Sequence, residues 1–211
     1  MKFISFVEPP YLISRVFNQL IWENTEQKIC LTIDDGPFPE PTEKILKVLS
    51  QFKAKAIFFL TGKNVIENVN IVDAIISEGH FVANHSFNHS RKMMRMSRDE
   101  IRKEILETEN LLGDKFKFLK IFRPPYGRIN FRMFRELKSL NYKIMMWSLL
   151  TEDFRGEFEL VKRNLDKHLK DNSIIVFHNN SKSAHIIEKS LDYAFNLIYK
   201  RGYEIGSTFT F

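Results

Sequence analysis

Short apolar runs alternate along the chain with segments in which apolar residues recur every three or four positions. The runs are rich in β-branched and aromatic residues, which predicts buried strands. They cover residues 28–33, 55–60, 80–84, 118–122, 143–147, 173–177 and, more weakly, 203–207. Strands that alternate with helices predict a parallel sheet with helices outside it, as an open sheet or as a closed barrel. The pattern therefore indicates the α/β class.

The segments between the runs have the period of amphipathic helices. The stretch 97–113 is the clearest, because Ser97 and Glu100 form an S-x-x-E capping box and Gly113 provides a stop. Residues 41–52 open with a proline in the first turn, where a helix tolerates it. Three further helices are predicted, at residues 131–140, 157–169 and 185–200.

The segment before the first strand has its own pattern. Leu12, Val16 and Leu20 form a helical stripe, so residues 1–27 are expected to be a helical segment packed on a domain of residues 28–211. Peripheral contact with a membrane surface is the less favoured alternative, because the polar side of the stripe carries a single arginine.

Composition narrows the class of protein. A chain of 211 residues with no linker fits a single domain, which we expect to be a monomer. The net charge of +6 suggests a nucleic-acid partner, but the basic residues are interleaved with acids and form no stripe with aromatics, so we expect none. The basic stretch 91–98 is interpreted as a solvated loop, with contact to an anionic polymer or surface as the alternative.

Targeting signals and disulfides are also constrained by the sequence. The apolar run in residues 1–10 is too short for a secretory signal, and no run approaches the ~18 residues of a membrane span. We therefore expect a cytoplasmic protein without a transmembrane segment. The single cysteine, Cys30, excludes an internal disulfide, and its apolar surroundings predict a buried, inert thiol.

Reactive residues follow the carboxyl ends of the predicted strands. Asp34 and Asp35 end the first strand, and His85 and His89 follow the third. Four more come after later runs, namely Arg123, Tyr126, Asp153 and His178. In a parallel barrel these strand ends share one rim, so the residues are expected to converge on one site.

Two of these segments have chemistry of their own. His85 and His89 are four residues apart, and with a carboxylate from another strand they give the donor set of hydrolytic zinc and non-haem iron sites. The alternative for Asp34 or Asp35 is to cap the helix that begins near Pro41. The stretch "FRPPYGR" is a rigid loop that would hold Arg123 in place, or else a plain turn with a surface arginine.

Taken together, "TIDDGP", "HSFNH", "RPPYG", the Asp153 region and "IIVFHNN" resemble, in order and spacing, the polysaccharide deacetylase family with its NodB homology domain (carbohydrate esterase family 4). The resemblance runs from Lys28 to the C-terminus. It implies a distorted (β/α) barrel with seven parallel strands. It also implies removal of acetyl groups from N-acetylated sugars with a divalent metal, most commonly zinc, with cobalt, nickel, manganese and iron as alternatives.

The resemblance implies different roles for the two adjacent aspartates. Asp35, His85 and His89 would bind the metal, and Asp34 would be the general base, oriented by Arg123. A metal lowers the pKa of the attacking water, so a carboxylate beside it only has to collect the proton.

On the leaving-group side, the resemblance implies that His178 protonates the sugar amine and that Asp153 favours its charged form. The family's fourth motif, Asp-x-x-Asp-Trp, reads "LTEDF" here, so Leu150 replaces the first aspartate and Phe154 the tryptophan. The "HNN" of the fifth motif is also less usual.

Four residues are expected on the substrate side. The backbone N–H of Tyr126, next to Pro125, would stabilise the oxyanion. Phe154 would wall a pocket for the acetyl methyl group, and Val176 fits the aliphatic position two residues before the histidine.

We therefore predict a metal-dependent hydrolase that removes acetyl groups from an N-acetylated sugar or polysaccharide, such as one containing N-acetylglucosamine. The alternatives are a deacylase of a small non-polysaccharide amide and a catalytically silent carbohydrate-binding homologue. Retention of Asp34 and His178 argues against the silent homologue, because binding needs neither a base nor an acid.

Overall fold

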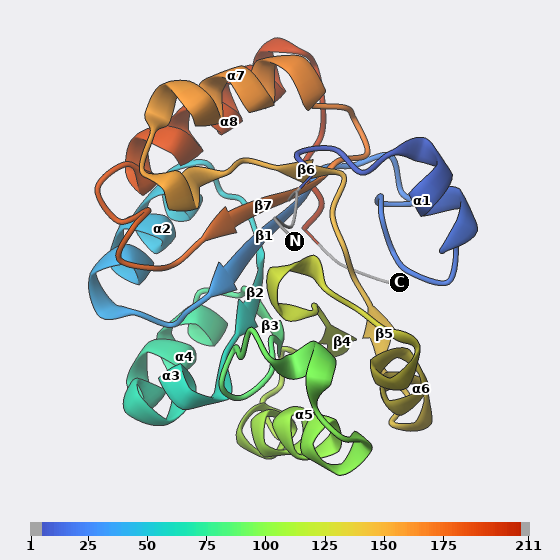
Figure 1. Cartoon of the computed structure of the whole chain (residues 1–211). Coiled ribbons are helices and arrows are strands. Elements are labelled where there is room, and N and C mark those ends of the chain that lie inside the picture. Colours follow the sequence, from blue (N-terminus) through green and yellow to red (C-terminus); the bar gives the residue numbers. More distant parts are fainter. Residues whose placement is uncertain (1–5, 208–211) are drawn as a thin grey trace.

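The computed structural model describes residues 6–207, and its strands form one parallel sheet. The spatial order of the strands is β5-β4-β3-β2-β1-β7-β6. Their bounds are β1 Cys30–Asp35, β2 Ile57–Leu60, β3 Phe81–Asn84, β4 Phe118–Phe122, β5 Lys143–Ile144, β6 Leu149–Leu150 and β7 Ile174–His178. Figure 1 shows the strands as an arc with most helices on its outer side. The expected seven-stranded distorted barrel is confirmed.

Helices connect the strands around the outside of this arc. The α-helices are α1 Tyr11–Val16, α2 Pro39–Gln51, α3 Gly62–Glu67, α4 Val69–Ser77, α5 Arg98–Leu112, α6 Phe131–Ser139, α7 Phe158–His168 and α8 Ile187–Lys200. Three single 3-10 turns lie at η1 Met93–Arg95, η2 Pro125–Gly127 and η3 Asp153–Arg155. Among residues 6–207, no helix is long and apolar enough to cross a membrane.

Most of the predicted elements are present, with differences at the ends of the sheet. The capping box at Ser97 and Glu100 forms as expected at the start of α5. The segment 203–207 is not a strand, although Ile205 makes a single parallel bridge to Ile29. The seventh strand is β6 instead, a pair of leucines too short to give a strand pattern in the sequence.

The two faces of the sheet pack differently, as expected for side chains that alternate along a strand. Leu31 and Ile33 of β1 face the large core shared with the helices. Cys30 belongs to a smaller core inside the barrel, together with Phe59 of β2. Burial raises the pKa of the Cys30 thiol to about 12, so the prediction of a buried thiol holds.

The N-terminal segment spans the open side of the arc, between β6 and β5 (Figure 1). The N–H of Leu150 donates to the carbonyl of Val7 at one end. At the other end Ile21 donates to the carbonyl of Ile144 and accepts from the N–H of Met146, each at 2.8 Å. We call residues 6–23 the N-terminal strap.

The helical part of the strap differs from the sequence prediction. The helix has six residues, none of them buried, and Leu12 and Val16 are exposed. The expected packing of this stripe is therefore wrong for these two residues, while Leu20 is buried. The strap is attached to the barrel through backbone hydrogen bonds, the Trp147 bond to the carbonyl of Phe6, ion pairs of Glu8, and the buried Leu20. The apolar periodicity indicates the burial of Leu20 but not these hydrogen bonds and ion pairs.

Candidate active site

The reactive residues meet at the carboxyl-terminal rim of the barrel. Asp34 of β1 lies beside His178 of β7 in the sheet register, and the N–H of His85 continues the ladder by donating to the carbonyl of Leu60. Arg123 extends β4 in the same way, with its N–H on the carbonyl of Asn84. The convergence expected from strand ends is therefore present.

Asp34 is paired with a fully buried arginine. Arg123 Nη1 donates to Asp34 Oδ1 at 2.6 Å and to Thr32 Oγ1 at 2.7 Å. Arg123 Nη2 donates to the carbonyl of Met146, and the guanidinium lies 4.1 Å from the ring centroid of Phe59. A buried guanidinium needs such partners, so it fixes the orientation of the Asp34 carboxylate.

Asp35, His85 and His89 form a compact set of donor atoms. Asp35 Oδ1 lies 3.7 Å from His85 Nε2 and 3.4 Å from His89 Nε2. The chosen ligand atoms of the three residues all lie within 4.8 Å of one another. Two donors bound to one tetrahedral zinc ion are about 3.4 Å apart, so the spacing fits a divalent cation held by two imidazoles and a carboxylate.

The protonation of the two histidines agrees with metal binding. His85 Nδ1 donates to the carbonyl of Arg123 at 2.8 Å, so the lone pair of Nε2 faces Asp35. Burial, followed by repulsion from His89, lowers the pKa of His85 well below its usual 6.5. Burial also lowers the pKa of His89. Both rings are therefore neutral near pH 7, as metal ligands must be.

The loop that carries the histidines is held from outside the rim. It is not helical, so the two rings converge through a tight loop, with positive φ at Ser86 and His89. Glu104 of α5 accepts hydrogen bonds from the backbone N–H groups of Phe87 and Asn88 and from the Asn88 side chain. These bonds fix the loop between the two ligands.

Asp35 leaves the strand geometry to reach this loop. Alternation along β1 would aim it away from Asp34, toward the layer that packs on the helices. Its φ of 78° instead turns the chain at the rim. Asn180 Nδ2 donates to Asp35 Oδ2 at 2.7 Å, leaving Oδ1 toward the histidines.

The partly buried His178 and the fully buried Asp153 form a second pair on the rim. His178 Nδ1 donates to Asp153 Oδ1 at 2.7 Å, and the backbone N–H of His178 donates to Oδ2 at 2.7 Å. Burial alone would lower the pKa of His178. The charge and hydrogen bond of Asp153, with the charges of Asp35 and Asp34, outweigh burial and raise that pKa to about 9. His178 is therefore a charged acid near pH 7.

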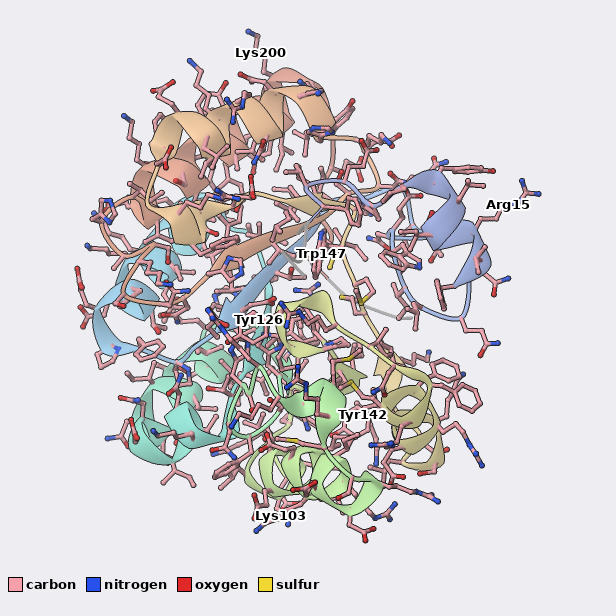
Figure 2. All side chains as sticks on the ribbon, viewed as in Figure 1. Arg15, Lys103, Tyr126, Tyr142, Trp147 and Lys200 are labelled. Atoms are coloured by element: carbon pink, nitrogen blue, oxygen red, sulfur yellow. The ribbon has the colours of Figure 1, made fainter. Side chains whose placement is uncertain are left out.

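The "RPPYG" loop forms a wall of the site. The ring of Tyr126 lies 4.5 Å from that of His89, and Tyr126 has a φ of 58°. Gly127 follows with a φ of 64°, and a Cβ there would lie 2.2 Å from the Trp147 ring, so glycine is required. Figure 2 shows Tyr126 and Trp147 in the centre of the molecule.

The remaining predicted site residues divide into two groups. Tyr126 and Phe154 line the cavity at the rim, and the ring of Phe154 lies edge-on to His178 at 5.0 Å. Pro125 and Val176 are buried and do not line this cavity. Pro124 lines the cavity in place of Pro125. His80, directly before β3, lies buried against Phe58.

Two supporting residues were not identified from the sequence. Glu104 lies on the buried face of α5 with Ile101 and Ile105, so a carboxylate within an apolar stripe was the available signal. Asn180 gave a weaker signal, because "HNN" shows amides after a histidine but not their target.

The chain is similar to known proteins over most of its length. The family model described as polysaccharide deacetylase matches residues 23–145, which include Asp34, Asp35, His85, His89 and Arg123. A peptidoglycan-N-acetylglucosamine deacetylase of Bacillus cereus is 36% identical over 153 residues, which are 72% of this chain and 55% of that protein. The PgdA deacetylase of Listeria monocytogenes is 31% identical over 85% of this chain and 38% of its own length.

The chain thus spans only part of the length of these two relatives. Two other matches cover most of this chain and most of the matched protein. A second Bacillus cereus peptidoglycan-N-acetylglucosamine deacetylase is 32% identical over 86% of this chain and 87% of that protein. The crystal structure of a peptidoglycan N-acetylglucosamine deacetylase in complex with 4-naphthalen-1-yl-N-oxidanyl-benzamide superimposes with a TM-score of 0.84, at 29% identity and over 94% of each chain. The chain therefore belongs to the polysaccharide deacetylase family.

Proposed function

We propose that this protein is a metal-dependent hydrolase that removes the acetyl group from an N-acetylated amino sugar of a polysaccharide. The substrate class that the relatives suggest is peptidoglycan, since their names specify N-acetylglucosamine or N-acetylmuramic acid deacetylases.

One observation carries the proposal. Three residues whose spacing fits a cation lie on the same rim as a carboxylate held by Arg123 and a histidine, His178, held by Asp153. Hydrolysis of an unactivated amide needs both a base for water and an acid for the departing nitrogen. A protein that only binds a sugar needs neither group.

Asp35, His85 and His89 would hold the metal, for which we propose zinc. When bound, the cation would supply Lewis-acid chemistry, polarising the acetamide carbonyl and making water more acidic. The arrangement of two neutral imidazoles and one carboxylate supports this choice.

The protein side chains would carry the protons. Asp34 accepts a proton as water adds to the acetamide carbon, and the salt bridge to Arg123 keeps its second oxygen free for this role. His178 donates its proton to the sugar nitrogen as the carbon–nitrogen bond breaks, which releases acetate and a free amine. Tyr126, at the edge of the cavity, would donate its backbone N–H to the carbonyl oxygen.

The direct test is acetate release. The protein loaded with zinc is incubated with N-acetylglucosamine oligomers and with N-acetylated peptidoglycan strands, and acetate is measured with time. Asp34→Asn and His178→Ala are expected to reduce the rate by about 10²-fold or more. Asn196→Ala, an exposed change on α8, serves as the control that should leave the rate unchanged. Equal acetate release by wild type and both site variants would refute the proposal.

A further inference from the structure

The cavity that contains the catalytic rim continues well beyond it. Its volume is about 1040 Å³, at the upper end of the ~300–1,000 Å³ usual for ligand pockets. One end holds the catalytic residues described above. The lining also includes Trp147 and apolar side chains of the N-terminal strap, and we call this part of the cavity the apolar arm.

The apolar arm is built from side chains of three segments far apart in sequence. Its lining includes Ile13, Phe17 and Trp22 from the strap, with Ile129, Phe134 and Met146 from the barrel. The strap is fixed by the Trp147 Nε1 hydrogen bond to the carbonyl of Phe6 at 3.0 Å. Trp22 Nε1 donates to the carbonyl of Phe17 within the strap. These two tryptophan hydrogen bonds hold the part of the strap that lines the cavity.

The mouth of the arm leaves apolar side chains in water. Val16 of α1 and Phe131 of α6 both line the cavity, and they are 71% and 73% exposed. A six-residue helix with no buried residue is marginal on its own, and exposed apolar side chains that line one cavity are typical of a binding site. A hydrocarbon group entering the arm would cover both side chains.

The basic residues that line the cavity indicate that the group between the sugar and the hydrocarbon is anionic. Among the described residues that line the cavity, Asp34 and Asp35 are the carboxylates, and the basic residues are Arg91, Arg128 and Lys182. The guanidinium carbons of Arg91 and Arg128 each lie 5.5 Å from the ring centroid of Tyr126. Positive charge thus lies next to the ring that contacts metal ligand His89, where an anionic linkage such as a phosphate diester would be stabilised.

We infer that the protein acts on an amphiphilic substrate, an N-acetylated amino sugar joined through a phosphate to a hydrocarbon chain. The acetamide lies at the catalytic rim, the phosphate beside Arg91 and Arg128, and the chain in the apolar arm. This assignment rests on the proposed deacetylase function for its sugar end, while the arm itself is a binding site that can be tested separately.

Binding is measured through the protein's own fluorescence. The chain has two tryptophans, Trp22 and Trp147, and both line the cavity, so a ligand in the arm changes their emission. The probes are the methyl glycoside, the octyl glycoside and the 1-(octyl phosphate) of N-acetylglucosamine, each kept below its aggregation concentration. Because each buried methylene is worth about fourfold in Kd, we expect the octyl glycoside to bind at least about tenfold tighter than the methyl glycoside. The octyl phosphate is expected to bind tighter again.

Variants of exposed residues avoid effects on folding. Val16→Asp combined with Phe131→Asp should remove the tenfold gain from the octyl chain and leave binding of the methyl glycoside unchanged. Leu12→Asp is the matched control, since Leu12 lies on the same helix and is exposed but does not line the cavity.

The charge is tested in the same way. Arg91→Gln should remove the extra affinity of the octyl phosphate over the octyl glycoside. Arg95→Gln, which changes an exposed arginine that does not line the cavity, should not.

The outcomes separate this inference from the proposed function. Equal Kd values for methyl and octyl glycosides, or a loss of the chain effect with Leu12→Asp, would overturn the apolar arm as the chain site. An unchanged phosphate effect in Arg91→Gln would overturn the anionic linkage. Chain-dependent binding without acetate release from any probe or polymer would uphold the arm and reject the deacetylase function.

Discussion

Asn180 Nδ2 donates a hydrogen bond to Asp35 Oδ2 at 2.7 Å, and the other oxygen, Oδ1, faces the two histidines. The bond thus orients the carboxylate that we assign to the metal. Removing this bond frees the carboxylate to rotate. We expect Asn180→Ala to weaken zinc binding about 10–100-fold, as is typical when a partner of a metal ligand is lost. Competition with a chromogenic chelator measures this affinity. Asn196→Ala is the control, and an unchanged affinity in Asn180→Ala would show that Asp35 is oriented by other contacts.

Removal of the proposed metal ligands should abolish both metal binding and acetate release. We expect zinc-loaded wild type to retain one ion per chain after dialysis, and the double variant His85→Ala/His89→Ala to retain none. His185→Ala removes an exposed histidine that bonds the Gly156 carbonyl and should keep the ion. Elemental analysis of the dialysed proteins decides the matter, and equal metal content in all three would disprove the site.

Asp34→Asn should affect both rate and stability. The amide cannot accept the proton of water, so acetate release should fall about 10²–10⁴-fold. The buried Arg123 charge also loses its counter-charge, which should lower the free energy of unfolding by about 3 kcal/mol.

Chemical denaturation and acetate assays together separate the two effects of Asp34→Asn. The control is Glu136→Gln, which weakens the ion pairs of the buried Glu136 with the exposed Arg98 and Arg102. It should lower stability and leave the rate per folded molecule unchanged. A full rate in Asp34→Asn would exclude this residue as the base.

The His178–Asp153 pair predicts a specific pH dependence. His178 is raised from 6.5 to a pKa of about 9 in the folded chain, so its protonated form stabilises the fold fully below pH 6.5. This contribution is lost as the pH rises through 9, and kcat/KM should fall over the same range because the acid loses its proton. Asp153→Asn removes the charge that raises the pKa and should move this decline to lower pH.

The measurement is a pH profile of acetate release together with melting temperatures at the same pH values. Asp166→Asn, whose carboxylate accepts from the Tyr193 hydroxyl on the protein surface, should leave both profiles unchanged. A basic limb that does not move in Asp153→Asn would mean that His178 is not the titrating acid.

The sequence predicted the reactive residues of the rim better than the residues that hold them in place. Strand ends in a parallel barrel meet by topology, so residues at or just after them could be predicted to converge without detailed geometry. These residues are Asp34, Asp35, His85, His89 and Arg123. The choice of Asp35 as the ligand depends instead on its positive φ, a local backbone feature that alternation along a strand does not predict.

Other parts depend on contacts between distant segments. Glu104 holds the histidine loop from α5, and Asn180 reaches Asp35 from the far end of the chain. The strap pairs through backbone atoms, whose partners no side-chain pattern reveals. Helices α3 and α4 were not identified because together they bury only four residues, Gly62, Val65, Val72 and Ile75, too few for a clear period.

The N-terminal strap has a consequence for where the domain can be cut. The matched family segment begins at residue 23, so a chain trimmed to that boundary would lose Val7 and Ile21, which pair with the outer edges of β6 and β5. Open edges of a sheet are templates for pairing with other chains. Such a truncated protein should self-associate at the two ends of its sheet, and size-exclusion chromatography would detect this. We therefore expect residues 6–22 to protect both ends of the sheet from pairing with other chains.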